Sequence, residues 1–132
     1  MNNQLKVAVL GGGSWATAIV KMLCENLETV GWYMRSTYIA EHINLNKHNP
    51  NYLSSAELHP SQLDLSNDIN KVVSNYDILI FAIPSAFLTL ELEKLAESLE
   101  CKIVFSAIKG IVPETGLITG GHLYEKYNVP YK

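Results

Sequence analysis

Residues 5–18 read LKVAVLGGGSWATA, and this stretch decides the fold of the chain. Its first six residues form an almost continuous apolar run, which is typical of a parallel β-strand covered on both faces. Glycines end the run, and from Ser14 the apolar residues follow a helical period. They are Ala16, Ile19, Val20, Leu23 and Leu27. The sequence therefore predicts a strand that passes through a glycine turn directly into a helix.

The glycine turn carries the pattern G-x-G-x-x-A at Gly11, Gly13 and Ala16. In such a turn the first glycine permits a sharp bend, the second lets a diphosphate approach the backbone, and the third position must be small for close helix packing. Free N–H groups and the positive end of the helix dipole favour an anion there. Because the turn joins a predicted strand to an amphipathic helix, it predicts dinucleotide binding rather than a purely structural turn.

Strand and helix patterns alternate along the rest of the chain. Further strands are expected at residues 29–34, 77–83 and 102–107. Further helices are expected at residues 37–46, from a cap at Ser66 or Asn67 to Val73, along the stripe Leu88, Leu92, Leu95 and Leu99, and at about 120–127. Residues 47–66, which contain two prolines, are expected to be irregular, and Pro113 and Gly116 predict a turn. The fold class is then α/β: one Rossmann-type domain over residues 1–132, with a doubly wound, mostly parallel sheet and helices on both faces.

The residues that follow the predicted strands point to the ligand, because ligands bind beyond the carboxyl ends of parallel strands. Arg35 ends the second strand, where NAD-selective proteins usually carry an acid. A guanidinium can bind a ribose 2′-phosphate or lie against adenine, so the site is expected to accept NADP(H) as well as NAD(H), and an exposed surface arginine remains the alternative. Pro84 and Phe87 are expected along the dinucleotide path. Lys109 would attract a phosphorylated or carbonyl substrate, or is a solvated loop residue.

Other side chains and the composition exclude several functions. Trp15 is either a core residue or an aromatic wall over the cofactor. The charges on the stripe helix, including Glu91, are expected on its solvated side. The net charge of -3 does not indicate the excess of basic residues that is typical of nucleic-acid-binding proteins, and the four histidines lack the spacing of metal ligands. Cys24 and Cys101 are read as reduced thiols, which favours the cytoplasm, and no signal peptide or membrane insertion is expected.

Four stretches together resemble the N-terminal domain of bacterial NAD(P)-dependent glycerol-3-phosphate dehydrogenases. They are GGGSWATA at 11–18, NPNYL at 49–53, FAIPS at 81–85 and SAIKGI at 106–111. The resemblance implies that hydride transfer with NAD(P)H interconverts dihydroxyacetone phosphate and sn-glycerol 3-phosphate, a reaction that supplies the backbone of membrane phospholipids. It implies cofactor contacts from Ser14 and Trp15 at the turn, Arg35 at the adenosine end, and Tyr52 and Phe87 beside the dinucleotide, while Lys109 touches cofactor and substrate.

Two departures from the family pattern concern Ala16, where glycine is common, and Ser36, where a second basic or polar residue is frequent. The choice between NAD and NADP therefore stays open, as does a homodimer in a full-length form. The family's helical C-terminal domain carries the lysine that accepts the proton, and we expect that domain to be absent from this chain, which then holds no catalytic residue. A dehydrogenase of the hydroxy-acid or ketopantoate type and a non-catalytic dinucleotide sensor are the alternatives.

Overall fold

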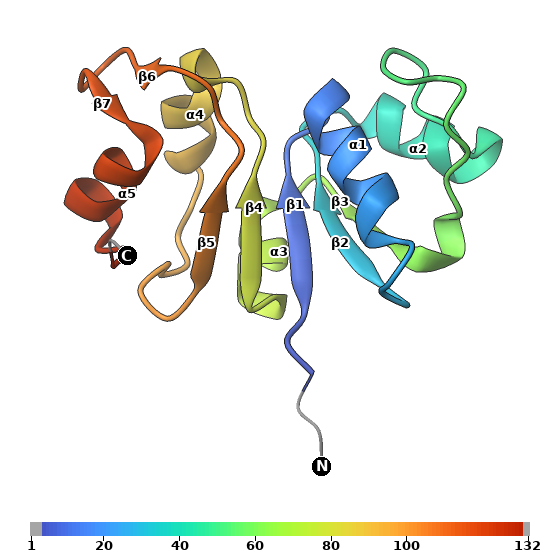
Figure 1. Ribbon diagram of the computed structural model, residues 1–132, viewed down its shortest axis with the longest axis horizontal. Helices are drawn as coiled ribbons and strands as arrows, with labels where there is room; N and C mark the ends of the chain where they lie inside the picture. The colour runs from blue at the N-terminus through green and yellow to red at the C-terminus, as the bar shows by residue number, and fades with distance from the viewer. Residues whose placement is uncertain (1–3, 131–132) are drawn as a thin grey trace.

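The structure, a computed structural model, describes residues 4–130 as five helices, two small groups of strands and one short 3₁₀ segment (Figure 1). The main strands are β1 (Val7–Leu10), β2 (Val30–Tyr33), β3 (Leu63–Ser66), β4 (Ile78–Phe81) and β5 (Ile103–Ser106). The helices are α1 (Ser14–Leu23), α2 (Thr37–Asn46), α3 (Ile69–Asn75), α4 (Ser85–Leu92) and α5 (Thr119–Tyr127). The 3₁₀ segment η1 is Pro60–Gln62, and a hairpin of β6 (Ile111–Val112) and β7 (Leu117–Ile118) precedes α5.

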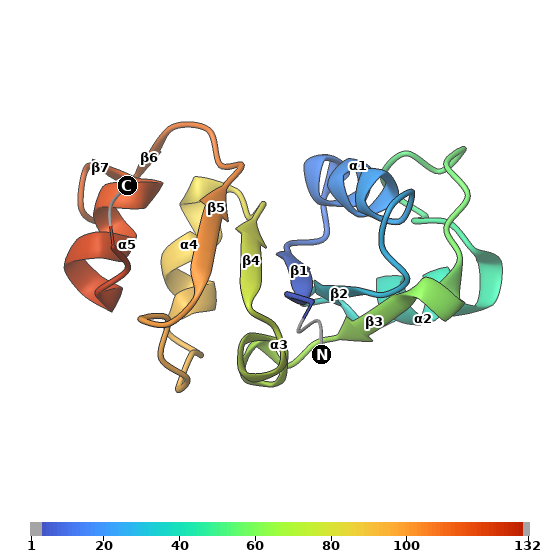
Figure 2. The ribbon, with the colours of Figure 1, turned by 60° about the horizontal axis from the view of Figure 1, so that its bottom comes forward.

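The five main strands form one parallel sheet in the order β3-β2-β1-β4-β5. Helix α1 covers one face and α3 the other (Figure 2). Side chains of β1 alternate between two apolar clusters: Ala8 and Leu10 pack toward α3 and α4, and Val9 packs toward α1. The predicted fold class, a doubly wound Rossmann-type α/β sheet, is confirmed.

The strand order places the glycine turn at the point where the chain changes direction across the sheet. The chain runs outward from β1 to β2 and β3, and it then returns to β4 on the other side of β1. In open parallel sheets this switch point is where a crevice forms beyond the strand ends. The turn that follows β1 therefore opens into the expected place for a ligand.

Three predicted elements differ from the structure. The segment expected to be irregular contains β3, an edge strand in which Asp64 faces away from its leucine neighbours and accepts a hydrogen bond from Tyr76 Oη at 2.7 Å. The cap of α3 is Asp68, whose carboxylate accepts from the N–H groups of the first turn. Helix α4 ends at Leu92, well before Leu99.

The early end of α4 has a side-chain cause. Asn70 Oδ1 accepts hydrogen bonds from the N–H groups of Ala96 and Glu97, at 2.6 and 3.2 Å, and its Nδ2 donates to the Lys94 carbonyl. These bonds tie residues 94–97, which are not helical, to α3, and Leu99 stays buried. The predicted turn at Pro113 and Gly116 is confirmed. None of the helices in residues 4–130 is long and apolar enough to cross a bilayer.

Candidate functional site

The first glycine of the turn is held in a conformation that other residues rarely adopt. Gly11 has φ +132°, and a β-carbon there would lie 2.4 Å from the Ala82 carbonyl oxygen at the end of β4. Gly13 differs, because a β-carbon built on it meets nothing within 4 Å. Gly11 is therefore required by packing against β4, whereas Gly13 leaves free space on the outer side of the turn.

The carbonyl groups of the three glycines are all held on the protein side. Trp32 Nε1 donates to the Gly11 carbonyl at 2.6 Å, and the Gly13 carbonyl accepts from both Thr17 N–H, at 3.0 Å, and Thr17 Oγ1, at 2.7 Å. The Gly12 carbonyl accepts from the side chain of Asn49 at 3.3 Å. With the carbonyls turned inward, the amide groups of the turn are free to point outward.

Those amide groups have no competing partner among residues 4–130. No described residue in 4–130 accepts a hydrogen bond from Gly12 N–H or Gly13 N–H, and no side chain caps the N-terminus of α1. Donors clustered at a helix N-terminus bind phosphate groups, since the helix dipole adds its positive end to them. The turn thus fits a diphosphate in both charge and space.

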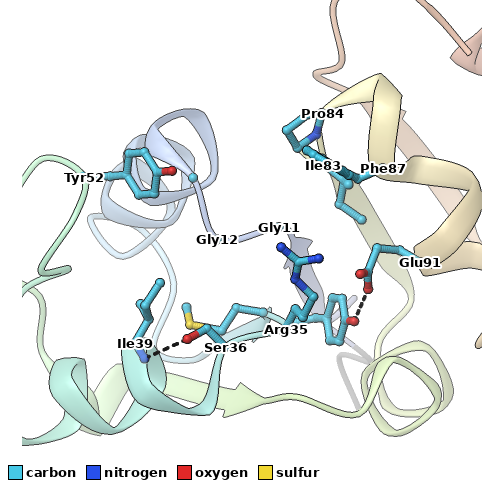
Figure 3. A pocket seen from close by; sticks show the side chains of 13 residues that line it. Gly11, Gly12, Arg35, Ser36, Ile39, Tyr52, Ile83, Pro84, Phe87 and Glu91 are labelled. Atoms are coloured by element: carbon cyan, nitrogen blue, oxygen red, sulfur yellow. Dashed lines mark hydrogen bonds between the residues drawn. The ribbon is translucent and has the colours of Figure 1, made fainter. Parts of the chain in front are cut away.

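A cavity of about 220 Å³ lies beside the turn, between the ends of β1 and β2 and the start of α4 (Figure 3). It is lined by Gly11, Gly12, Gly13, Tyr33, Met34, Arg35, Ser36, Ile39, Tyr52, Ile83, Pro84, Phe87 and Glu91. Sites that enclose a whole small ligand usually exceed roughly 300 Å³. This cavity therefore suits one end of a dinucleotide whose diphosphate lies on the turn.

Arg35 and Phe87 face each other in this cavity. The guanidinium carbon of Arg35 lies 5.9 Å from the centre of the Phe87 ring, a cation–π distance. Arg35 follows β2 and Phe87 lies in the first turn of α4, so two elements that the sheet order separates meet here. A flat base could stack against either group.

Tyr52 is brought to the cavity by the buried side chain of Asn49. Besides its bond to Gly12, Asn49 donates to Thr17 Oγ1 at 3.0 Å, and its Oδ1 accepts from the N–H groups of Asn51 and Tyr52 at 3.0 and 3.3 Å. The segment expected to be irregular is therefore tied to the glycine turn, and Tyr52 and Gly12 both line the cavity (Figure 3). This explains why the NPNYL stretch accompanies the turn.

Four of the predicted site residues do not line the cavity. Ala16 is fully buried against the sheet, as its packing position requires, and Ser14 is exposed in the first turn of α1. Trp15 is 63 % exposed, so the interpretation as a core residue is wrong. Lys109 is exposed in the loop after β5, and a β-carbon on the next residue, Gly110, would lie 3.7 Å from Ser85 Oγ. The Lys109 loop thus runs beside the start of α4.

The main residues that the sequence reasoning missed are Tyr33 and Glu91. Glu91 was expected in solvent but is only 5 % exposed, and its carboxylate accepts from Tyr33 Oη and pairs with Lys94 Nζ at 3.1 Å. Burial, and then the hydrogen bond to Glu91, raise the pKa of Tyr33, which keeps its hydroxyl protonated as the donor. The available signal was spacing, because Glu91 follows Phe87 by one helical turn.

Known proteins are similar to this chain in sequence and in fold. Residues 6–128 match the family model of the NAD-dependent glycerol-3-phosphate dehydrogenase N-terminus. The chain is 37 % identical over 115 residues to glycerol-3-phosphate dehydrogenase [NAD(P)+] of Pseudomonas fluorescens Pf-5, covering 87 % of this chain and 33 % of that protein. Its relative from Pseudomonas aeruginosa PAO1 is 36 % identical, with 87 % and 34 % covered.

Among solved structures, glycerol-3-phosphate dehydrogenase of Plasmodium falciparum superposes with a TM-score of 0.81 at 27 % identity, covering 96 % of this chain and 39 % of that one. The enzyme of Coxiella burnetii gives a TM-score of 0.77 at 18 % identity, with 96 % and 39 % covered, which supports the fold alone. The chain spans about a third of the length of the curated relatives it matches.

Proposed function

The chain belongs to the NAD-dependent glycerol-3-phosphate dehydrogenase family, and on this premise we propose that it binds NAD(H) or NADP(H) for that enzyme's reaction. The diphosphate lies on the amides of Gly12, Gly13 and the first turn of α1. The adenosine end enters the cavity between Arg35 and Phe87. The observation that carries the proposal is the inward anchoring of all three glycine carbonyls, because it leaves the amides as unopposed donors for an anion.

The reaction is the reversible transfer of hydride between the nicotinamide ring and the C2 atom of sn-glycerol 3-phosphate or dihydroxyacetone phosphate. Within this chain, the turn and cavity orient the cofactor, and Lys109 provides positive charge beside the substrate phosphate or carbonyl. Ser14 and Trp15 lie where they can contact the dinucleotide from the α1 side, and Tyr52 and Pro84 flank it. A small phosphorylated molecule is the partner of the site, in a cytoplasmic setting.

The proton acceptor is a lysine of a helical C-terminal domain in the complete enzyme. The coverage of the relatives supports this division, since the chain matches only their N-terminal third. On this proposal the purified chain binds dinucleotide but shows no meaningful turnover of dihydroxyacetone phosphate. Robust reduction of that substrate by the chain alone would contradict the division of roles.

Binding is tested by isothermal titration calorimetry with NADH. Gly13→Asp places a carboxylate in the open space over the turn, where it repels a diphosphate without a clash. We expect heat of binding for the wild type and none for Gly13→Asp, with an unchanged melting temperature. The matched control is Asn75→Asp, which adds the same charge on an exposed residue at the end of α3. If the wild type gives no heat with NADH or NADPH, the proposal is wrong.

A further inference from the structure

We propose that Glu91 is a specificity-determining residue that favours NAD(H) over NADP(H) at this site. The inference rests on the proposed function and adds the choice of cofactor to it. Glu91 is the one acidic side chain among the thirteen described residues that line the cavity, and it lies across from Arg35 in Figure 3. Arg35 attracts a 2′-phosphate and Glu91 repels it, so the two side chains act on that group in opposite directions.

The carboxylate of Glu91 is held in the cavity wall by two side chains. Glu91 is nine-tenths buried, and its Oε2 accepts the hydrogen bond of Tyr33 Oη. Lys94 Nζ lies 3.1 and 3.3 Å from its two oxygens. Tyr33 comes from β2 and Lys94 follows α4, so the carboxylate is held from two sides. The carboxylate group is therefore fixed in position in this wall.

The position of Arg35 brings its ligand into the range of that charge. Its guanidinium lies 5.9 Å from the Phe87 ring, and Glu91 follows Phe87 by one turn of α4, about 6 Å along the helix axis. NADP(H) carries a phosphate of about −2 charge on the ribose, where NAD(H) has a neutral hydroxyl that can donate to a carboxylate. Repulsion between the phosphate and Glu91 is little screened by water, since Glu91 is buried.

The cation nearest to Glu91 offsets this repulsion only in part. The side chain of Lys94 is 50 % exposed, against 7 % for Glu91, so solvent screens the ammonium more than the carboxylate. Arg35 remains as the attractive group. The two cofactors thus make the same contacts with the glycine turn. They differ in the group that faces Arg35 and Glu91, and these two residues therefore determine which cofactor binds more tightly.

The test compares the dissociation constants of NADH and NADPH, measured by calorimetry at pH 8, for the wild type and Glu91→Gln. The amide keeps the size of the side chain and its acceptor for Tyr33 but removes the charge. We expect the wild type to bind NADH more tightly, and Glu91→Gln to improve NADPH binding by about tenfold relative to NADH, the effect of one charge that Lys94 offsets in part. Glu93→Gln, which removes an exposed charge two residues away, is expected to leave the ratio unchanged.

A second variant acts in the opposite direction and does not depend on Glu91→Gln folding well. Lys94→Met removes the offsetting cation and keeps the carboxylate, so the preference for NADH is expected to widen severalfold. A wild-type preference for NADPH, or an NADH-to-NADPH ratio that neither variant changes, overturns the role of Glu91 while leaving dinucleotide binding in place. Absence of binding of both nucleotides to the wild type overturns the proposed function itself.

Discussion

Replacing Asn49 by alanine tests whether one buried side chain holds the glycine turn in its binding shape. Asn49 is fully buried and makes four hydrogen bonds, donating to Thr17 Oγ1 and the Gly12 carbonyl and accepting from the N–H groups of Asn51 and Tyr52. Alanine removes all four at once. The turn then loses its tie to the segment that carries Tyr52.

The expected cost follows from those bonds. Each contributes about 0.5–1.5 kcal/mol net. Two of the four are 3.0 Å long and two are 3.3 Å, so values near the middle and the lower end of that range apply respectively. The free energy of unfolding should fall by about 3 kcal/mol, which lowers the melting temperature by on the order of 10 °C for a domain of this size. NADH affinity should also fall by roughly tenfold or more, because the Gly12 carbonyl is released.

Urea unfolding and calorimetric titration measure the two effects. Asn51→Ala is the matched control, because Asn51 is exposed and contributes only its backbone N–H, which alanine keeps. Asn49→Asp separates the roles further: it keeps the acceptors for the loop but puts a negative charge beneath the diphosphate, so it should weaken NADH binding more than alanine does. Wild-type stability and wild-type NADH affinity in Asn49→Ala would refute the reasoning.

Three other predictions concern single positions. Gly11→Ala should fail to fold, because of φ +132° and a β-carbon 2.4 Å from the Ala82 carbonyl, whereas Gly13→Ala should melt like the wild type; equal melting temperatures would contradict this. Burial lowers the pKa of His122 below its ordinary 6.5, so the folded state binds fewer protons than the unfolded chain, and stability is full above pH 6.5 and declines as the pH falls below it. Urea midpoints at pH 5 and 7.5 should differ less in His122→Gln than in the wild type. Lys109→Ala in a full-length enzyme should lower kcat/KM far more than dinucleotide affinity, and an equal loss of both would argue against its proposed place beside the substrate.

The parts of the fold that could be predicted from the sequence are those whose residue pattern lies within one continuous segment. The apolar run of β1, the glycines and the stripe of α1 follow one another, so period and turn chemistry suffice to find them. Strand β3 was missed because only one of its faces is apolar and its four residues lie at the sheet edge after a proline-rich segment. Its pairing with β2 joins residues that are far apart in the sequence, and a local residue pattern does not predict such a pairing.

The same distinction explains which site residues were found. Arg35 and Pro84 follow strand ends and Phe87 lies in the first turn of the helix after β4, so the topology rule located them, and all three line the cavity. Glu91 lies two turns into a helix and is buried by Tyr33, a partner 58 positions earlier in the chain. A glutamate on an amphipathic helix is ordinarily solvated, and only the meeting of β2 with α4 reverses that expectation.

The glycine pattern alone does not ensure the diphosphate binding that is usually inferred from it. It requires that the backbone can bend sharply and approach a ligand closely, but it does not decide which way the peptide groups face. That orientation comes from Trp32 on β2, Thr17 on α1 and Asn49 on the following loop, each of which holds one glycine carbonyl inward. Since a peptide's N–H and C=O point in opposite directions, fixing the carbonyls fixes the donors. A turn with the same glycines but without the side chains of Trp32 and Asn49 would therefore be free to turn the Gly11 and Gly12 carbonyl oxygens toward the diphosphate, and it would repel the anion that the motif is taken to bind.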